Sequence, residues 1–327
     1  MHNMDLEAEV KNETANVEKI LAETNKVIVG QNQIGRRLLM AMISGGHVLL
    51  EGLPGLAKTT SIKSLGQVTD LAFKRIQFTP DLLPADLVGT QIYDPRSAEF
   101  KVKKGPIFTN LLLADEINRA PAKVQSALLE AMEEKQITIG ENTWRLEEPF
   151  LVMATQNPIE HEGTYPLPEA QVDRFFFKLN ITYTSPEDEV EIVKRASNRD
   201  AIQLEKVAGK ESILAMRKFI DRIYIADKIR TYIVNLVHAT RNPKKHGFPD
   251  LARLIEWGAS PRASIYIDRA ARTNALFEGR SFVTPQDVKD VAFDILRHRV
   301  KPTYEAEAEN ISSESLIGKI MEQVDVP

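Results

Sequence analysis

A short glycine-bearing segment has the residues and the spacing of a phosphate-binding loop. Residues 52–59 read Gly-Leu-Pro-Gly-Leu-Ala-Lys-Thr, and they lie between the apolar run Val48–Leu50 and a segment of helical character. The backbone N–H groups of such a loop, with the start of the following helix, surround phosphate oxygens. Lys58 adds a positive charge, and the Thr59 hydroxyl can reach a bound Mg²⁺. Ala57 stands where the strict pattern has glycine, but it still donates its N–H.

Two adjacent carboxylates follow a second apolar run. Leu111–Ala114 leads directly into Asp115 and Glu116. In a protein with a phosphate loop, the first acid of such a pair holds the Mg²⁺ shell, and its neighbour orients or deprotonates an attacking water. Taken alone, an acidic pair after a strand is more often the entry to a solvated loop. The phosphate loop makes the chemical interpretation the better one.

Polar residues also stand at the ends of two later apolar runs. Asn157 follows Phe150–Ala154 closely, and it would emerge at the carboxyl edge of the sheet if that strand lies beside the phosphate-loop strand. The alternative is an ordinary turn asparagine before Pro158. Arg174 directly precedes Phe175–Phe177, which we expect to be a strand. By itself, Arg174 reads as a surface charge.

The elements that position these residues change in character near residue 184. Before it, short apolar runs alternate with helical patterns, which is typical of buried parallel strands in an α/β fold. After Ser185, a plausible N-cap, and Pro186 at a first helical position, apolar residues recur at helical spacing. We therefore expect an α/β domain over residues 1–184, with a parallel sheet between helices, and an all-helical domain over residues 185–327.

Composition excludes several classes of protein. The 327-residue chain has a net charge of −4, which argues against a nucleic-acid binder that works by bulk positive charge. It contains no cysteine, which excludes disulfides, thiolate zinc sites and cysteine nucleophiles. No apolar run approaches the roughly 18 residues that span a bilayer, and the acidic N-terminus does not read as a signal peptide. We expect a cytoplasmic protein.

The combined motifs resemble those of AAA+ ATPases, and specifically of the MoxR family in their helix-2-insert branch. The resemblance extends over nearly the whole chain, from residues 27–31 to residues 280–288. Its most specific stretches are residues 52–59, 112–120, 154–175 and 258–263. Ala57 is the MoxR form of the phosphate loop. The resemblance implies a P-loop NTPase core with a parallel sheet, followed by a helical lid.

The same resemblance implies ATP and Mg²⁺ as cofactors and gives roles to individual residues. Lys58, Thr59, Asp115 and Glu116 would form the two Walker motifs, with Thr59 and Asp115 holding the metal. Asn157 would be sensor 1, Arg174 the arginine finger and Arg262 sensor 2, so that the catalytic set is Lys58, Glu116, Asn157, Arg174 and Arg262. The residues expected to contact the nucleotide are Val29, Gly30, Gln31, Gly52, Pro54, Gly55, Leu56, Ala57, Lys58, Thr59 and Thr60.

An arginine finger acts on a neighbouring subunit, so the resemblance also implies a ring, which in this class is a hexamer. It further implies a chaperone-like ATPase that matures or activates partner proteins, often with a von Willebrand factor A-domain partner. Alternating residues on either side of turn-forming segments predict hairpins near residues 84–105 and 136–147. In the wider class such hairpins face a pore or a partner.

Two other functions are compatible with a phosphate loop. A helicase-like ring ATPase acting on nucleic acid is the first, because helix-2-insert relatives include helicases. The near-zero charge of the helical half argues against it. The second is a binding module that holds ATP as a switch, and Glu116 argues against that, because a switch without turnover needs no water-activating acid.

Overall fold

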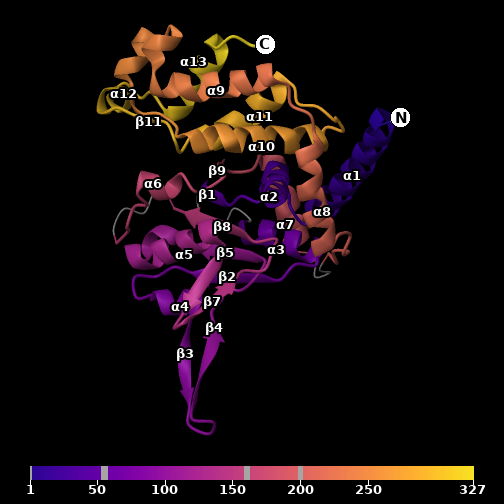
Figure 1. Ribbon diagram of the computed structural model, residues 1–327, viewed down its shortest axis with the longest axis vertical. Helices are drawn as coiled ribbons and strands as arrows, with labels where there is room; N and C mark the ends of the chain where they lie inside the picture. Colours follow the sequence, from indigo (N-terminus) through magenta and orange to yellow (C-terminus); the bar gives the residue numbers. More distant parts are fainter. Residues whose placement is uncertain (1, 53–57, 158–162, 198–201) are drawn as a thin grey trace. The chain divides into compact units, whose positions relative to one another are not determined.

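The computed structural model describes residues 2–52, 58–157, 163–197 and 202–327. It forms two compact units (Figure 1). The sheet unit comprises Lys19–Phe175 and Leu179–Leu214, and the helical unit comprises Met1–Glu18, Phe176–Lys178 and Ala215–Pro327. The first helix, α1 (His2–Asn25), therefore begins in the helical unit and ends in the sheet unit. A domain boundary near residue 184 stays a prediction.

A five-stranded sheet forms the middle of the sheet unit. Its strands, in spatial order, are β2 (Phe73–Gln77), β5 (Leu111–Asp115), β8 (Leu151–Gln156), β1 (Val48–Gly52) and β9 (Phe177–Ile181). The pairings of β2 with β5, β5 with β8 and β8 with β1 are parallel. In β5 and β8 every residue except the last is buried. This two-sided burial explains why these strands are continuous apolar runs in the sequence, and the predicted α/β fold is confirmed.

The last strand of the sheet differs from the prediction. The run Phe175–Phe177 was expected to be a strand, but β9 begins only at its third residue and continues to Ile181. Burial alternates along β9, because this strand lies at the edge of the sheet. Phe175 instead joins the core of the sheet unit, and Phe176 packs against the ring of Tyr266, with 4.9 Å between ring centroids.

Helices and two hairpins complete the sheet unit. The helices are α2 (Asn32–Ser44), α3 (Lys58–Val68), α4 (Pro84–Val88), α5 (Ala122–Glu134), α6 (Glu169–Val172) and α7 (Pro186–Ser197), with the 3-10 turn η1 (Ile117–Arg119). One antiparallel hairpin pairs β3 (Gly89–Asp94) with β4 (Glu99–Lys104), and the other pairs β6 (Gln136–Ile139) with β7 (Asn142–Arg145). Both lie at the predicted segments. In Figure 1 the β3–β4 hairpin projects from the sheet unit.

The helical unit is built mainly from packed helices. Its elements after α8 (Lys210–Phe219) are η2 (Ile220–Arg222), α9 (Asp227–Arg241), η3 (Pro243–His246), η4 (Pro249–Arg253), β10 (Ile255–Trp257), α10 (Pro261–Phe277), α11 (Pro285–Leu296), β11 (Lys301–Pro302), α12 (Tyr304–Ala308) and α13 (Ser313–Gln323). The expectation of helices alone is corrected by β10 and β11, which pair antiparallel. In the described part of the chain, no helix is both long and apolar enough to cross a membrane.

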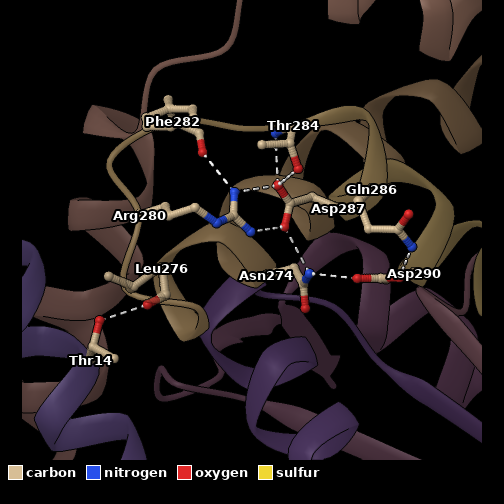
Figure 2. A network of polar contacts seen from close by, with 9 residues as sticks. All are labelled: Thr14, Asn274, Leu276, Arg280, Phe282, Thr284, Gln286, Asp287 and Asp290. Atoms are coloured by element: carbon tan, nitrogen blue, oxygen red, sulfur yellow. Dashed lines mark hydrogen bonds and ion pairs between the residues drawn. The ribbon is translucent and has the colours of Figure 1, made fainter. Parts of the chain in front are cut away.

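A buried carboxylate joins the ends of α10 and α11 (Figure 2). Asp287 is fully buried, and its oxygens accept hydrogen bonds from Arg280 at 2.6 and 2.7 Å. The N–H and hydroxyl of Thr284 donate to the same carboxylate at 2.7 and 2.8 Å, and the amide of Asn274 donates at 2.9 Å. A buried charge with this many donors holds both helix ends in place.

Candidate active site at the carboxyl edge of the sheet

The predicted acidic pair lies at the carboxyl end of β5, the second strand of the sheet. Asp115 is the last residue of β5, and Glu116 follows it in a left-handed conformation, with φ 55° and ψ 51°. A non-glycine residue in this region costs on the order of 1–3 kcal/mol and persists only when its surroundings fix it. The left-handed turn at Glu116 ends the strand and starts η1.

The carboxylate of Asp115 is held by one partner on each oxygen. The hydroxyl of Thr155, in β8, donates to Oδ1 at 2.6 Å. Arg75, in β2, donates to Oδ2 through Nη2 at 2.6 Å and through Nε at 3.2 Å. The two donors come from the strands on either side of β5. The carboxylate orientation is therefore set by the order of the strands.

Glu116 has its own set of donors. Nε2 of Gln77, the last residue of β2, donates to Oε2 at 2.7 Å, and Nη1 of Arg119 lies 3.0 Å from the same oxygen. The backbone N–H of Glu116 donates to the Thr155 hydroxyl at 2.9 Å. These contacts fix both the left-handed backbone and the side chain of Glu116.

The described residues of the phosphate loop are its two ends. Gly52 ends β1, and a side chain there would come within 2.7 Å of the carbonyl oxygen of Ile181, so only glycine fits. Lys58 is the first residue of α3, and its Nζ donates to the carbonyl oxygen of Gly52. Thr59 and Thr60 continue α3. Pro54, Gly55, Leu56 and Ala57 lie outside the described residues.

The ammonium group of Lys58 and the two carboxylates share one electrostatic environment. Burial lowers the pKa of Lys58 below its ordinary value, and the negative charges of Asp115 and Glu116 partly oppose that shift. A desolvated cation at the start of α3 and two carboxylates at the end of β5 together form a compact polar site. Sites of this kind in open α/β sheets lie at the carboxyl edge.

The other predicted nucleotide contacts lie in the sheet unit as well. Asn157 directly follows β8 and is half-buried. Gly30 has φ 70°, and a side chain there would come within 2.6 Å of Asp188 Oδ2. Gln31 donates from Nε2 to the carbonyl oxygen of Thr182 at 3.0 Å, and Val29 is half-buried. The segment 29–31 is thus packed against the chain around the start of α7.

The two predicted arginines belong to different units. Arg174 lies just after α6 in the sheet unit, and its Nε lies 2.6 Å from Oε2 of Glu133 in α5. Arg262 lies in the first turn of α10 in the helical unit, where its N–H donates to the N-cap hydroxyl of Ser260 at 3.2 Å. The catalytic role of each arginine stays a prediction.

Sequence reasoning missed four residues of this site: Thr155, Gln77, Arg75 and Arg119. Thr155 is the only hydroxyl-bearing residue of β8, and it stands next to the predicted polar end of that strand. That position was the available signal. No pattern in the sequence indicated Gln77 or Arg75, because their contacts depend on the placement of β2 beside β5. No cluster of three or more histidine, cysteine or acidic residues suited to a metal was found among the described residues.

The fold and the site define an AAA+ ATPase. Residues 47–177 match the model of the "ATPase family associated with various cellular activities (AAA)", and residues 251–320 match that of an AAA lid domain. The chain is 48% identical over 96% of its length to "Chaperone MoxR1" of Mycobacterium tuberculosis, and it covers 83% of that protein. It is 33% identical to "Protein MoxR" of Paracoccus denitrificans, with 94% of this chain and 95% of that one covered.

A solved structure gives the same result for the fold. A crystal structure from Cytophaga hutchinsonii is 49% identical in sequence, with a TM-score of 0.94, and the match covers 100% of this chain and 99% of the other. The chain belongs to the MoxR family of AAA+ ATPases.

Proposed function

We propose that this protein binds and hydrolyses ATP at the carboxyl edge of its sheet. The observation that supports this most is that the ammonium group of Lys58, at the start of α3, shares its electrostatic environment with Asp115 and Glu116 at the end of β5. Lys58 donates to the carbonyl oxygen of Gly52, and the two carboxylates accept hydrogen bonds from Thr155 and Gln77. Lys58 neutralises phosphate charge, and the N–H groups at the start of α3 bind phosphate oxygens. Glu116 takes a proton from the attacking water, because it is the acid next to the metal-binding Asp115.

Mg²⁺ fits the donor set that the site offers. A carboxylate and a hydroxyl are hard oxygen donors, and Mg²⁺ is usually bound by one or two carboxylates together with substrate phosphates. Asp115 and Thr59 are the residues that would hold it. The ion neutralises charge on the phosphates when it is bound. In the part of the chain that the structure describes, no group of three or more histidine, cysteine or acidic side chains could hold a metal by itself, which agrees with an ion that arrives with the nucleotide.

The remaining predicted residues act in a ring of identical subunits, which we propose is a hexamer. Arg174 would reach the nucleotide of a neighbouring subunit and stabilise charge that develops as the phosphate bond breaks. Arg262, on the helical unit, would report the presence of nucleotide to that unit. Asn157 would position the γ-phosphate or the attacking water.

We further propose that turnover remodels or activates a partner protein, with a von Willebrand factor A-domain protein as the expected partner. Support comes from the name "chaperone" carried by a relative that is 48% identical. The β3–β4 hairpin supplies a surface for such a partner. It exposes Ile92, Tyr93 and Phe100, with 5.3 Å between the two aromatic ring centroids.

Two substitutions test the nucleotide site. Lys58→Ala should lose ATP binding, whereas Glu116→Gln should bind ATP with the parental affinity and hydrolyse it at a small fraction of the parental rate. Lys63→Ala is the matched control, because Lys63 is exposed on the same helix. Equal ATP affinity in Lys58→Ala and the parent protein would remove the phosphate-loop assignment.

Partner binding is tested with the Glu116→Gln protein, which should retain ATP and its partner together. The captured partner should raise the ATPase rate of the parent protein, and the double variant Tyr93→Ser/Phe100→Ser should lose this stimulation while keeping its basal rate. Stimulation by single-stranded DNA in place of a protein would instead favour a nucleic-acid motor.

A further inference from the structure

We propose that Thr155 is a positioning residue that couples the metal-holding acid to the water-activating acid. This inference rests on the proposed roles of Asp115 and Glu116. One hydroxyl group contacts both residues: it donates to the Asp115 carboxylate at 2.6 Å and accepts the Glu116 N–H at 2.9 Å. The two bonds use the single proton of the hydroxyl and one of its lone pairs, so their directions are fixed relative to each other.

The position of Thr155 gives this bridge its rigidity. Thr155 lies in β8, between β5 and β1, and pairs with Leu50 in β1. Its side chain is buried, with 1% of the residue exposed. Water therefore cannot replace the hydroxyl if it is removed, and the Glu116 N–H and Asp115 Oδ1 would each lose a partner.

Two other donors to the acids, Arg75 and Arg119, are more exposed and could be exchanged for water. The side chain of Arg75 is 51% exposed, and that of Arg119 is 43% exposed. Thr155 is thus the buried partner of Asp115, and it also holds the backbone of Glu116 in its left-handed conformation. Partners of this kind, which orient a metal ligand without touching the metal, affect metal affinity or activity by about ten- to a hundredfold when they are replaced.

The chain offers a set of substitutions that separates the hydroxyl from the shape of the side chain. Thr155→Val keeps the branched shape and removes the hydroxyl, and Thr155→Ser keeps the hydroxyl. Thr24→Val is the matched control, because Thr24 is buried in the same unit and its hydroxyl donates to the carbonyl oxygen of Ile20 at 2.7 Å.

The measurements are kcat, KM for ATP, and the affinity of a fluorescent ADP with Mg²⁺ and with EDTA. Thr155→Val should lower kcat about ten- to a hundredfold. In this variant, Mg²⁺ should increase the affinity for ADP by less than it does in the parent protein. The affinity for ADP in EDTA should equal that of the parent protein. For Thr155→Ser, kcat and the effect of Mg²⁺ on ADP affinity should both remain within about threefold of the parental values. Thr24→Val should lower the melting temperature without changing either readout.

Parental kcat and Mg²⁺ response in Thr155→Val would overturn the proposal, as would a serine variant as defective as the valine variant. If the valine protein does not fold, Thr155→Ala takes its place with the same expectations. Glu116→Gln is measured in parallel. If Glu116→Gln hydrolyses ATP at the parental rate, the proposed role of Glu116 is refuted. If Glu116→Gln loses turnover but Thr155→Val keeps the parental rate, only the positioning role of Thr155 is refuted.

Discussion

The guanidinium of Arg75 lies 2.6 Å from Oδ2 of Asp115, so a cation already stands beside the carboxylate that we expect to hold Mg²⁺. The Arg75 side chain is 51% exposed, and the Asp115 side chain is 18% exposed. The pair is therefore screened by solvent and contributes little to stability. Its importance is electrostatic, because a positive side chain and a divalent ion repel each other at one carboxylate.

Removing Arg75 should make the site bind Mg²⁺ more readily. We expect Arg75→Met to lower the Mg²⁺ concentration that gives half of the maximal ADP affinity by about two- to fivefold, a modest effect because the charge is half exposed. Lys74→Met, at the exposed neighbouring position of β2, is the control. A higher Mg²⁺ requirement in Arg75→Met would show that Arg75 orients Asp115 and does not compete with the ion.

The carboxylate of Asp287 should be a main source of stability in the helical unit. Arg280→Ala leaves this buried carboxylate without its charged partner, which should lower the free energy of unfolding by about 3 kcal/mol. Urea denaturation followed by circular dichroism measures the loss. Arg253→Ala is the control, because Arg253 pairs with Glu305 and Glu309 on the surface and should change stability by less than about 1 kcal/mol.

The same carboxylate predicts a pH dependence. Burial opposes ionisation of Asp287, but hydrogen bonds from Arg280, Thr284 and Asn274 outweigh it and hold its pKa below the ordinary value of 3.8. Its contribution to stability is therefore fully present above pH 3.8 and is lost as the pH falls through the lower folded-state value. Asp287→Asn should flatten the acid limb of the stability curve, and an unchanged limb would contradict this assignment.

The sequence was sufficient for the features that depend on local pattern. Continuous apolar runs identified β1, β5 and β8, and Ser185 with Pro186 located the start of α7. The bridge from Thr155 to Asp115 and Glu116 was out of reach, because it joins residues about 40 positions apart and depends on the order of the strands. The sequence pattern likewise did not show that residues 1–18 belong to the helical unit, because they are grouped there with the distant segment Ala215–Pro327.

A pair of histidines in the helical unit should respond to mild acid. Nδ1 of His238 lies 2.8 Å from Nε2 of His246, so one ring donates and the other accepts. Burial lowers the pKa of His246 below its ordinary value of 6.5, and the charge of His238 lowers it further. The neutral form is thus favoured in the folded state, and its contribution to stability is present above pH 6.5 and lost as the pH falls through the folded-state pKa.

His246→Gln should remove this part of the pH dependence. Between pH 8 and pH 5.5, the urea midpoint of the parent protein should fall by more than that of the variant. The imidazole resonances of His246, followed by NMR, should titrate below pH 6.5. A titration above pH 6.5, or equal pH dependence in parent and variant, would contradict a depressed pKa.

Arg174 is ion-paired with Glu133 of its own chain at 2.6 Å, and about one third of its side chain is exposed. An arginine finger stabilises charge that develops only in the transition state, so the removal of Arg174 should lower turnover and leave ATP binding nearly unchanged. Glu133→Gln should keep most of the turnover, because it removes the charge of this ion-pair partner and leaves that of Arg174 unchanged.

Mixing two inactive variants tests whether Arg174 acts between subunits. Arg174→Ala and Glu116→Gln should each hydrolyse ATP slowly when pure. Mixed rings contain some sites with Glu116 from one chain and Arg174 from the next, so the mixture should regain part of the parental rate. The specific rate of the parent protein should also rise with its concentration as subunits associate. Native mass spectrometry can show that rings are mixed, and absence of recovery in such rings would place Arg174 in a structural role beside Glu133.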